Sequence, residues 1–354
     1  MVDGRPVTPT SINVRSIVAV DGTSVVIAGN SPEHPDGMGA WRWSADGSVA
    51  ELASVTGTNT VAVGGPTIVI RRASTSLERS ETRVVHQSGQ TTIPSHAEVP
   101  LVTPRPTMSR VGKRRIPTAL LLPSDHRPGA KLPVLMDPYG GPHAQRVVDS
   151  YAAHCTSQWF ADQGFAVVVA DGRGTPALGT EWERSVHLDL ATAVLDDQVD
   201  ALHELAAQHP DLDLTRVGIR GWSFGGYLAA LAVIRRPDVF HAAVAGAPVT
   251  EWRLYDTHYT ERYLGNPREV ADPYDRTSLL LEAGRLTRPL LLVHGLADDN
   301  VVAAHTLQLS SALLAAGRAH EVLPLSGVTH MTPQPVVAEN LLRHQLEFLQ
   351  RSLG

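Results

Sequence analysis

This sequence has a single cysteine, and it lacks long apolar stretches and a recognisable signal segment. It has 354 residues and one cysteine, Cys155, which excludes an internal disulfide framework and fits a reducing compartment. No apolar run approaches the length of about 18 residues that a membrane-spanning helix needs, and residues 1–10 lack the apolar core of a secretory signal. We therefore expect a cytoplasmic protein with no membrane partner, in which Cys155 is a buried structural thiol.

Basic charge and cofactor motifs are scarce as well. The formal net charge is −6, which gives no reason to expect nucleic acid as a partner. The glycine-rich stretches at 138–143 and 171–175 match neither the phosphate-binding P-loop nor the strand-associated G-x-G-x-x-G pattern, and no cluster of metal-ligating residues stands out. The sequence thus predicts a protein without a cofactor or a metal ion.

Residues 12–98 consist of short, β-rich apolar runs separated by turn signals. The pairs Asp-Gly, Gly-Gly and Ser-Gly stand between these runs and indicate β-hairpins. Two groups of about four strands each are typical of propeller blades, whereas a closed ring has about four to eight blades. We expect residues 1–100 to form a partial β-propeller, as a remnant, as a fragment of a longer chain or as a small open β-domain.

The rest of the chain passes from a linker to an alternation of strands and helices. Residues 101–117 are rich in proline and basic residues and are predicted to be a linker. Buried strands are expected at 133–137, 166–170, 216–220, 242–247, 290–294 and 320–325, and helices at 150–163, 188–208, 225–235, 303–317 and 336–352. This alternation predicts an α/β domain over 118–354 with a doubly wound, mostly parallel sheet.

The hexapeptide GWSFGG at 221–226 joins a predicted strand to a predicted helix. A G-x-S-x-G match alone is weak, but the strand–turn–helix context is that of a nucleophile elbow. Such a turn strains the serine backbone and admits only small residues at Gly221 and Gly225. It also places Ser223 at the start of a helix, where the helix dipole favours negative charge. We therefore predict that Ser223 is a nucleophile.

A serine nucleophile needs a base and an orienting acid, which in this kind of sheet follow it in the order Ser, Asp or Glu, His. Asp298 and Asp299 both stand after the strand at 290–294, and spacing does not separate them. His330 lies on the loop past the next strand, so position selects it from the 16 histidines. His294 is expected to be structural. Three further histidines are expected at the surface: His305, His320 and His344.

Acyl transfer also requires an oxyanion hole, because negative charge develops on the carbonyl oxygen. One donor is expected from the backbone N–H of Phe224, the residue after the serine. The second is expected from the loop at 138–143, where Tyr139 offers a phenolic hydroxyl. Aromatic residues form 5% of the chain but are dense between Trp252 and Tyr263, which suits a flat apolar ring such as pyrrolidine.

Five blocks within residues 118–354 together resemble the prolyl oligopeptidase family, most closely its dipeptidyl peptidase IV branch. The blocks are PYGGPHAQ (138–145), DGRGT (171–175), GWSFGG (221–226), APVTEWRLYDTHYTERYLGNP (247–267) and HGLADDNV (294–301). The resemblance implies an α/β-hydrolase fold with Ser223 as nucleophile, Asp298 as acid and His330 as base. It also implies that Tyr139 and the Phe224 N–H form the oxyanion hole. The residues that match the family's pocket for a proline-like ring are Phe224, Val249, Trp252, Tyr255, Tyr259 and Val301, and Asn300 matches the asparagine that holds the penultimate carbonyl.

The resulting hypothesis is a serine peptidase that cleaves after proline or a small residue through an acyl-enzyme. Alternatives with the same triad are an acylaminoacyl-peptidase and a carboxylesterase, and a further alternative is a catalytically silent assembly module. A peptide is the expected partner, and a homodimer is among the expected assemblies. No counterpart of the family's glutamate pair for the substrate amine is found, so exopeptidase and endopeptidase specificity both stay open. We interpret Glu261 and Arg262 as a structural ion pair or loop anchor, and Arg173 as a hydrogen-bonding anchor.

Overall fold

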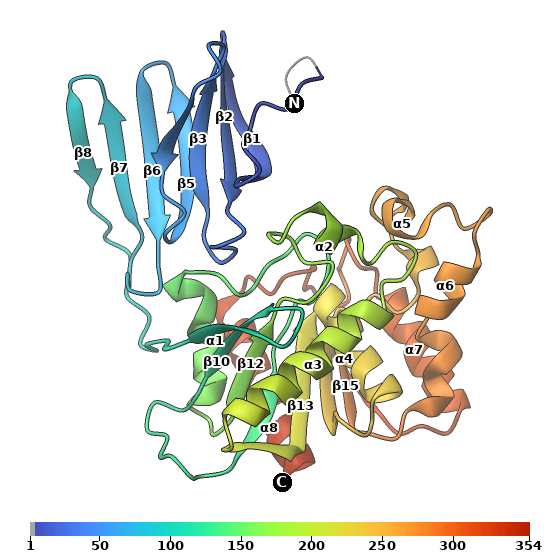
Figure 1. The fold of residues 1–354 in the computed structure, drawn as a ribbon. Helices are drawn as coiled ribbons and strands as arrows, with labels where there is room; N and C mark the ends of the chain where they lie inside the picture. Colours follow the sequence, from blue (N-terminus) through green and yellow to red (C-terminus); the bar gives the residue numbers. More distant parts are fainter. Residues whose placement is uncertain (1–3) are drawn as a thin grey trace. The chain divides into compact units, whose positions relative to one another are not determined.

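The computed structural model describes residues 4–354 and divides into two compact units (Figure 1). The β unit comprises Met1–Pro106, Val147–Trp159 and Pro176–Glu181, and the α/β unit comprises Thr107–Arg146, Phe160–Thr175 and Trp182–Gly354. Both units are built on β-sheets, but the sheets differ in strand direction and in burial.

The β unit contains two four-stranded antiparallel sheets whose strands are neighbours in chain order (Figure 1). The first sheet holds β1 (Asn13–Asp21), β2 (Ser24–Asn30), β3 (Gly39–Ser44) and β4 (Val49–Ala53). The second holds β5 (Thr58–Gly64), β6 (Thr67–Ala73), β7 (Glu81–His86) and β8 (Gly89–Ile93). The predicted turn pairs close the hairpins β1–β2, β3–β4, β5–β6 and β7–β8. The prediction of an all-β region with two propeller-like blades is therefore confirmed.

Cys155 lies on α1 (Tyr151–Ala161) and is only partly buried, which corrects the prediction of a buried thiol. The helix buries a different face, the one that carries His154 and Gln158, because residues four apart lie on the same side of a helix. The thiol contacts the Tyr151 carbonyl one turn earlier at 3.5 Å. Burial of the neighbouring face thus leaves Cys155 at the edge of the packed surface.

The α/β unit is built on an eight-stranded sheet with the order β16-β15-β14-β13-β11-β12-β10-β9. Its strands are β9 (Thr107–Val111), β10 (Ile116–Leu121), β11 (Leu132–Met136), β12 (Ala166–Ala170), β13 (Leu212–Trp222), β14 (Ala242–Gly246), β15 (Leu290–Gly295) and β16 (Glu321–Leu325). The six strands from β11 to β16 are parallel, and β9 and β10 are antiparallel neighbours at one edge. The predicted doubly wound, mostly parallel sheet is confirmed.

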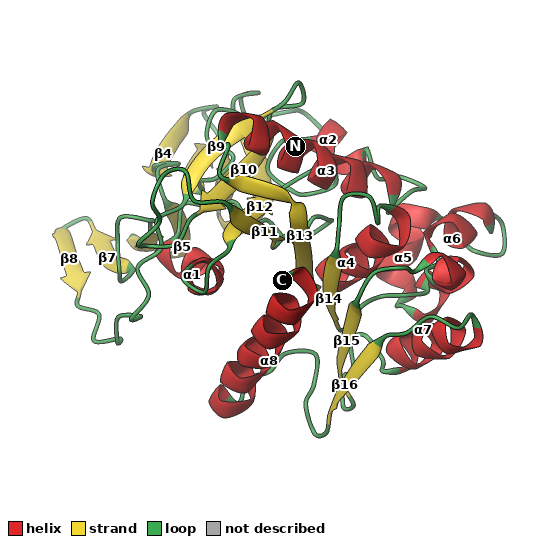
Figure 2. Cartoon of the chain, turned by 90° about the horizontal axis from the view of Figure 1, so that it is seen from below, coloured by secondary structure: helices red, strands yellow, loops and turns green. Residues whose placement is uncertain are grey.

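Helices cover both faces of this sheet. α8 (Pro335–Leu353) lies on one face, and α4 (Phe224–Arg235) and α7 (Ala304–Ala315) lie on the other (Figure 2). The remaining helices are α2 (Thr180–Arg184), α3 (Thr192–Gln208), α5 (Thr257–Leu264) and α6 (Asp272–Thr277), with the 3-10 helices η1 (Trp252–Leu254) and η2 (Leu280–Arg285). Within residues 4–354, none of the helices has the length and apolar character needed to cross a membrane. Because these strands are parallel, the loops that follow β11, β13, β15 and β16 all leave the sheet at the carboxyl ends of the strands.

The predicted linker at 101–117 is in part a hairpin. β9 and the start of β10 lie inside it, joined by a turn at 112–115. In this turn Arg114 Nε donates to the buried Asp197 carboxylate at 2.9 Å. The basic residues that suggested a linker therefore occupy a hairpin turn, where an acidic partner from α3 pairs with one of them. The predicted domain boundaries at 100 and 118 stay a prediction.

Candidate active site

Ser223 occupies the turn between β13 and α4. Its φ of 59° and ψ of −120° are a strained backbone conformation for a residue with a side chain. Its N–H donates to the Gly246 carbonyl at 2.9 Å. A Cβ on Gly221 would meet the carbonyl oxygen of Gly225 at 2.1 Å, and one on Gly225 would meet that of Pro138 at 2.8 Å. Close backbone approach thus requires both glycines, as expected for a nucleophile elbow.

His330 and Asp298 are paired on the loops after β16 and β15. His330 Nδ1 donates to Asp298 Oδ2 at 2.8 Å. Asp298 Oδ1 accepts from the backbone N–H groups of Asn300 and Val301 at 3.0 and 2.8 Å. Asp298 is buried, whereas Asp299 is exposed. The geometry therefore separates the two aspartates that spacing left open, and it gives Asp298 the position of a group that orients the imidazole.

A second histidine, His294, lies behind the same carboxylate. Its Nε2 donates to the Val301 carbonyl at 2.7 Å and lies 3.6 Å from Asp298 Oδ2, and its Nδ1 accepts from the Thr306 hydroxyl at 2.7 Å. Burial lowers the pKa of His294, although the bond to Val301 and the charge of Asp298 act in the opposite direction. The neutral ring with its proton on Nε2 fits these partners, so His294 holds the turn at 298–301 in place.

The serine turn and the histidine loop are tied together by Trp222. Its indole Nε1 donates to the His330 carbonyl at 2.7 Å. Among the described residues 4–354, Ser223 Oγ and His330 do not form a hydrogen bond with each other. Catalytic hydrogen bonds are often long until a substrate binds. The structure thus places His330 next to the serine turn through Trp222.

The two predicted oxyanion donors both lie beside Ser223. Burial, reinforced by Tyr255, raises the pKa of Tyr139 to about 12, and a side-chain hydrogen bond with Ser223 partly opposes this rise. A phenol with this pKa keeps its proton at neutral pH and can donate it in a hydrogen bond. Phe224 is the first residue of α4, and the N–H groups of a first turn have no acceptor within their helix. Both donors are therefore available to an oxyanion.

A buried ion cluster joins the Tyr139 loop to the strand that carries Ser223. Asp137 is fully buried and accepts from Arg146 Nη2 at 2.9 Å and from Arg220 Nη1 at 2.8 Å. Arg220 lies on β13, and Asp137 directly follows β11. A buried carboxylate with two guanidinium partners has a well-defined position. Sequence analysis missed this cluster, because its members are far apart in the chain and form no local pattern.

The residues predicted to form the substrate pocket lie together. The rings of Phe224 and Trp252 are 5.8 Å apart between centroids, and Trp252 stacks on Tyr259 at 6.0 Å with planes 6° apart. Tyr255 meets Tyr259 edge-on at 5.4 Å, and its hydroxyl donates to Asn300 Oδ1 at 3.0 Å. The remaining predicted pocket residues are buried in the hydrophobic cluster on which these rings pack: Val249 and Val301. The aromatic side chains form one cluster of packed rings, in which Phe224 and Trp252 are buried.

Three further residues extend this aromatic cluster. Tyr227 packs edge-on against Trp252 at 5.4 Å. Tyr263 lies 5.0 Å from the Tyr259 ring, and its hydroxyl is 2.8 Å from His143 Nε2. His143 stands inside the PYGGPHAQ block and Tyr263 inside the aromatic-rich segment, so both had a signal in the sequence. For Tyr227 the sequence showed only the helical pattern of α4, which does not indicate a place in the aromatic cluster.

His305 is fully buried, which corrects its predicted surface position. Its Nδ1 accepts from the Thr250 N–H at 3.2 Å, and the Thr250 hydroxyl donates to the His305 carbonyl at 2.7 Å. Burial lowers the pKa of His305 to about 4. The first turn of α7 therefore packs on the segment before η1, a contact that the periodicity of α7 does not reveal.

The two arginines interpreted as anchors have different environments. Arg173 donates to the Asp197 carboxylate through Nε at 3.0 Å and through Nη2 at 2.9 Å, so the predicted anchor is confirmed. Glu261 and Arg262 form no recorded ion pair within residues 4–354, because successive residues of a helix such as α5 do not face each other. Instead, the Arg262 guanidinium lies over the Tyr263 ring at 5.8 Å.

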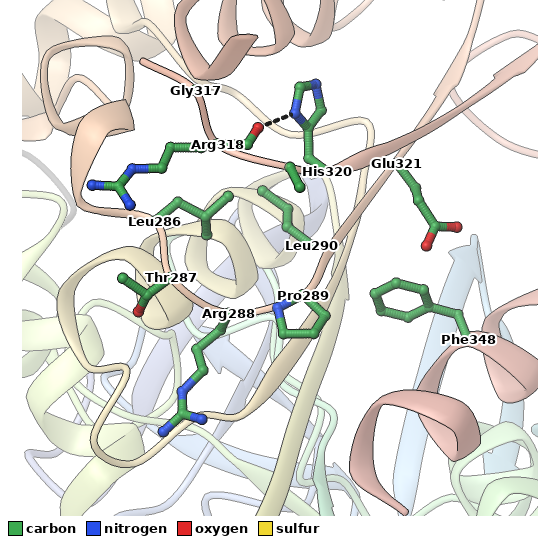
Figure 3. A pocket seen from close by; sticks show the side chains of 11 residues that line it. Leu286, Thr287, Arg288, Pro289, Leu290, Gly317, Arg318, His320, Glu321 and Phe348 are labelled. Carbon is green, nitrogen blue, oxygen red and sulfur yellow. Dashed lines mark hydrogen bonds between the residues drawn. The ribbon is translucent and has the colours of Figure 1, made fainter.

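A cavity of about 450 Å³ lies at the other edge of the sheet (Figure 3). It is lined by residues that precede β15 and β16, among them Arg288, Arg318 and His320, and by no predicted site residue. Ligands of parallel α/β sheets bind beyond the carboxyl ends of the strands, where Asp298 and His330 lie. The candidate site is therefore at the opposite edge from this cavity. In the part of the chain described, no three His, Cys, Asp or Glu side chains are grouped to hold a metal ion.

These elements define a class of protein. A serine on a strained turn after a parallel strand, with an acid and a histidine on the loops after two later strands, is the arrangement of the α/β-hydrolase fold. In this chain the fold is preceded by a propeller-like all-β region.

Comparison with known proteins agrees with this class. A model of the prolyl oligopeptidase family matches residues 151–354. Dipeptidyl peptidase 8 of Mus musculus is 40% identical over 240 residues, which covers 66% of this chain and 27% of that protein. Dipeptidyl peptidase 4 of Sus scrofa is 29% identical over 235 residues, covering 66% of this chain and 30% of that protein. The crystal structure of Porphyromonas gingivalis dipeptidyl peptidase 4 has a TM-score of 0.90 and 28% identity, covering 99% of this chain and 51% of that one.

The chain belongs to the prolyl oligopeptidase family, and these relatives support its place in the dipeptidyl peptidase IV-like branch. It spans about half the length of the bacterial structure, and the matched segments cover about a third or less of the mammalian relatives.

Proposed function

We propose that the α/β unit is a serine peptidase that cleaves peptides after proline or a small residue, with Ser223, His330 and Asp298 as its triad. The observation that carries this proposal is the His330–Asp298 hydrogen bond on the loops beside the strained Ser223 turn. Each member stands beyond the carboxyl end of a strand in one sheet, which is where such triads act.

The chemistry follows from the positions of the protons. His330 Nδ1 donates to Asp298, so its Nε2 is free to accept the Ser223 hydroxyl proton as Oγ attacks the peptide carbonyl. The carbonyl oxygen becomes an oxyanion, which the Tyr139 hydroxyl and the Phe224 N–H stabilise. His330 then gives its proton to the leaving amine, and an acyl-enzyme remains on Ser223. Water, deprotonated by His330, attacks the acyl carbon, and His330 returns the proton to Ser223 Oγ as the acyl C–O bond breaks and the carboxylic acid product leaves.

The proposed specificity rests on the aromatic pocket. The rings of Phe224, Trp252, Tyr255 and Tyr259 offer flat apolar surfaces that suit a pyrrolidine ring. Tyr255 holds Asn300, whose side-chain amide is proposed to bind a backbone carbonyl of the substrate. The relatives are named dipeptidyl peptidases, which supports a dipeptide as the released product.

The proposal is tested by labelling with a fluorophosphonate probe and by hydrolysis of chromogenic substrates. We expect the probe to label wild-type protein and the Ser311→Ala control, whose serine is exposed on α7, but not Ser223→Ala. We expect a Gly-Pro amide to be hydrolysed faster than an acetyl-Ala amide or a short-chain ester. Full hydrolysis by Ser223→Ala would contradict the triad, and turnover of the ester alone would favour a carboxylesterase. An intact protein that is not labelled would indicate a catalytically silent module.

A further inference from the structure

A cleft lies next to the aromatic cluster that we propose as the substrate pocket of the α/β unit. It has a volume of about 560 Å³ and is lined by charged and polar side chains. Those that carry the argument are His143, Glu183, Arg184, His187, Arg262 and Tyr263. They come from the loop after β11, from α2 and the residues after it, and from α5.

Two residues that line the cleft contact the aromatic cluster. The His143 ring is 5.1 Å and the Tyr263 ring is 5.0 Å from the ring of Tyr259, which stacks on Trp252. The hydroxyl of Tyr263 is 2.8 Å from His143 Nε2. Both side chains line the cleft and also contact Tyr259 of the aromatic cluster. A peptide whose ring occupies the pocket therefore has the cleft as its neighbour.

The walls of the cleft are held by backbone contacts on both sides. The Leu188 N–H donates to the Tyr263 carbonyl at 2.8 Å, which joins the segment after α2 to α5. The Gly174 N–H donates to the Trp182 carbonyl at 3.0 Å, which joins the DGRGT loop to α2. Backbone hydrogen bonds therefore join the segments that line the cleft.

The charges of the cleft are not balanced. Arg184 and Arg262 carry two positive charges and Glu183 one negative charge, and no ion pair is recorded for any of the three within residues 4–354. Elsewhere on the same surface, Arg253 pairs with Glu251 and Asp275. Burial raises the pKa of Tyr263, Arg262 lowers it and Glu183 raises it, so both charges act on this wall of the cleft. Unpaired charges lining a cavity are available to a ligand, and their excess is positive.

We propose that this cleft is a substrate subsite that favours a carboxylate side chain on a residue close to the ring-bound one. The inference rests on the proposed peptidase function and deepens it, because it names the charge of the preferred peptides. Arg184 and Arg262 attract the carboxylate, and Glu183 limits the attraction and repels a second acidic group.

The test uses peptide pairs that differ only by Glu or Gln at one position on either side of a fixed proline. The measured quantity is the ratio of kcat/KM for the Glu peptide to that for the Gln peptide. For the wild-type protein we expect this ratio to exceed one at one of the tested peptide positions. The ratio should decrease at high salt, because salt screens exposed charges. Arg184→Gln and Arg262→Gln each lower this ratio by about three-fold, and Glu183→Gln raises it by about three-fold, as exposed charge pairs do.

The matched control is Arg268→Gln, which removes an exposed arginine outside the cleft and leaves the ratio unchanged. A wild-type ratio of one or less at every position overturns the inference, and so does a shift in the same direction for the arginine and glutamate variants. If one of these two results is obtained while the Gln peptides are cleaved and Ser223 is labelled, the proposed function stands and only the subsite fails. If neither labelling nor cleavage is seen, the proposed function and the subsite fail together.

Discussion

The two units of this chain use their sheets in different ways. In the α/β unit, β12 and β15 are buried along their whole length, because helices cover both faces of the sheet. In the β unit, β8 is exposed along its whole length, and one cluster of buried apolar residues is formed by Ala40, Ala53 and Ile70. Antiparallel sheets tolerate a solvated face, whereas parallel sheets need cover on both sides.

This difference teaches where precise chemistry can be placed. Reactive side chains need fixed positions, and dense packing around their supporting elements provides them. Ser223 and Asp298 follow strands of the buried sheet. In the β unit, by contrast, Ile17 and Val20 on the edge strand β1 are 67% and 69% exposed. Substitutions in the two units should therefore differ in both stability and activity.

The largest effect is expected from Asp298, the acid of the proposed triad. Asp298→Asn should lower kcat by about 10⁴-fold, because the amide no longer stabilises the charged imidazole or selects its tautomer. The exposed neighbour provides a matched control, and Asp299→Asn should leave kcat within about two-fold. Steady-state hydrolysis of a prolyl substrate measures both. Equal losses for the two variants would remove the distinction between the aspartates.

The burial difference itself is tested by two large-to-small substitutions. Leu292→Ala, in a fully buried position on β15, should lower the free energy of unfolding by about 3 kcal/mol, because it leaves a cavity. Ile17→Ala on β1 should change it by less than about 0.5 kcal/mol. Urea unfolding followed by circular dichroism measures the two. A similar cost at both positions would contradict the comparison.

His305 in the α/β unit is expected to make the stability of the protein sensitive to acid. Its pKa is lowered to about 4 in the folded protein, so between the unfolded value near 6.5 and about 4 only the unfolded chain binds the proton. Stability is therefore complete above that range and falls as the pH falls, by about 2 kcal/mol between pH 7 and pH 4.5. His305→Gln should be less stable at pH 7 but should lose less on acidification. An unchanged pH slope in urea unfolding would refute this role.

The smallest effect is expected from His294, which positions the turn that carries Asp298. His294→Phe removes the donor to the Val301 carbonyl and should lower kcat by about ten-fold. His294→Gln keeps an N–H donor and should recover part of this loss. His320→Gln is the control, because His320 lies at the opposite edge of the sheet and bonds to Ser310. Equal kcat values for the Phe and Gln variants would argue against a positioning role.

Much of the fold could be predicted from local patterns. The strand expected at 166–170 coincides with β12, and those at 242–247 and 290–294 differ from β14 and β15 by one residue at one end. Burial on both faces makes such strands continuous apolar runs, which a sequence shows directly. The surface prediction for His305 was wrong, and the stretch predicted as a linker at 101–117 contains β9 and the start of β10. Both depend on partners distant in the chain, namely Asp197 for the β9–β10 turn and Thr250 for the imidazole.

By itself, the sequence determined the order of strands and helices, the serine turn and the loops that carry Asp298 and His330. These features depend on short-range patterns of apolar residues and glycines, and on the spacing of residues along the chain. Only the tertiary structure decided which aspartate meets His330, that Arg146 and Arg220 share Asp137, and that Tyr263 and His143 of the charged cleft contact Tyr259. Side chains that are far apart in sequence become neighbours only when the strands align and bring their loops to one edge of the sheet.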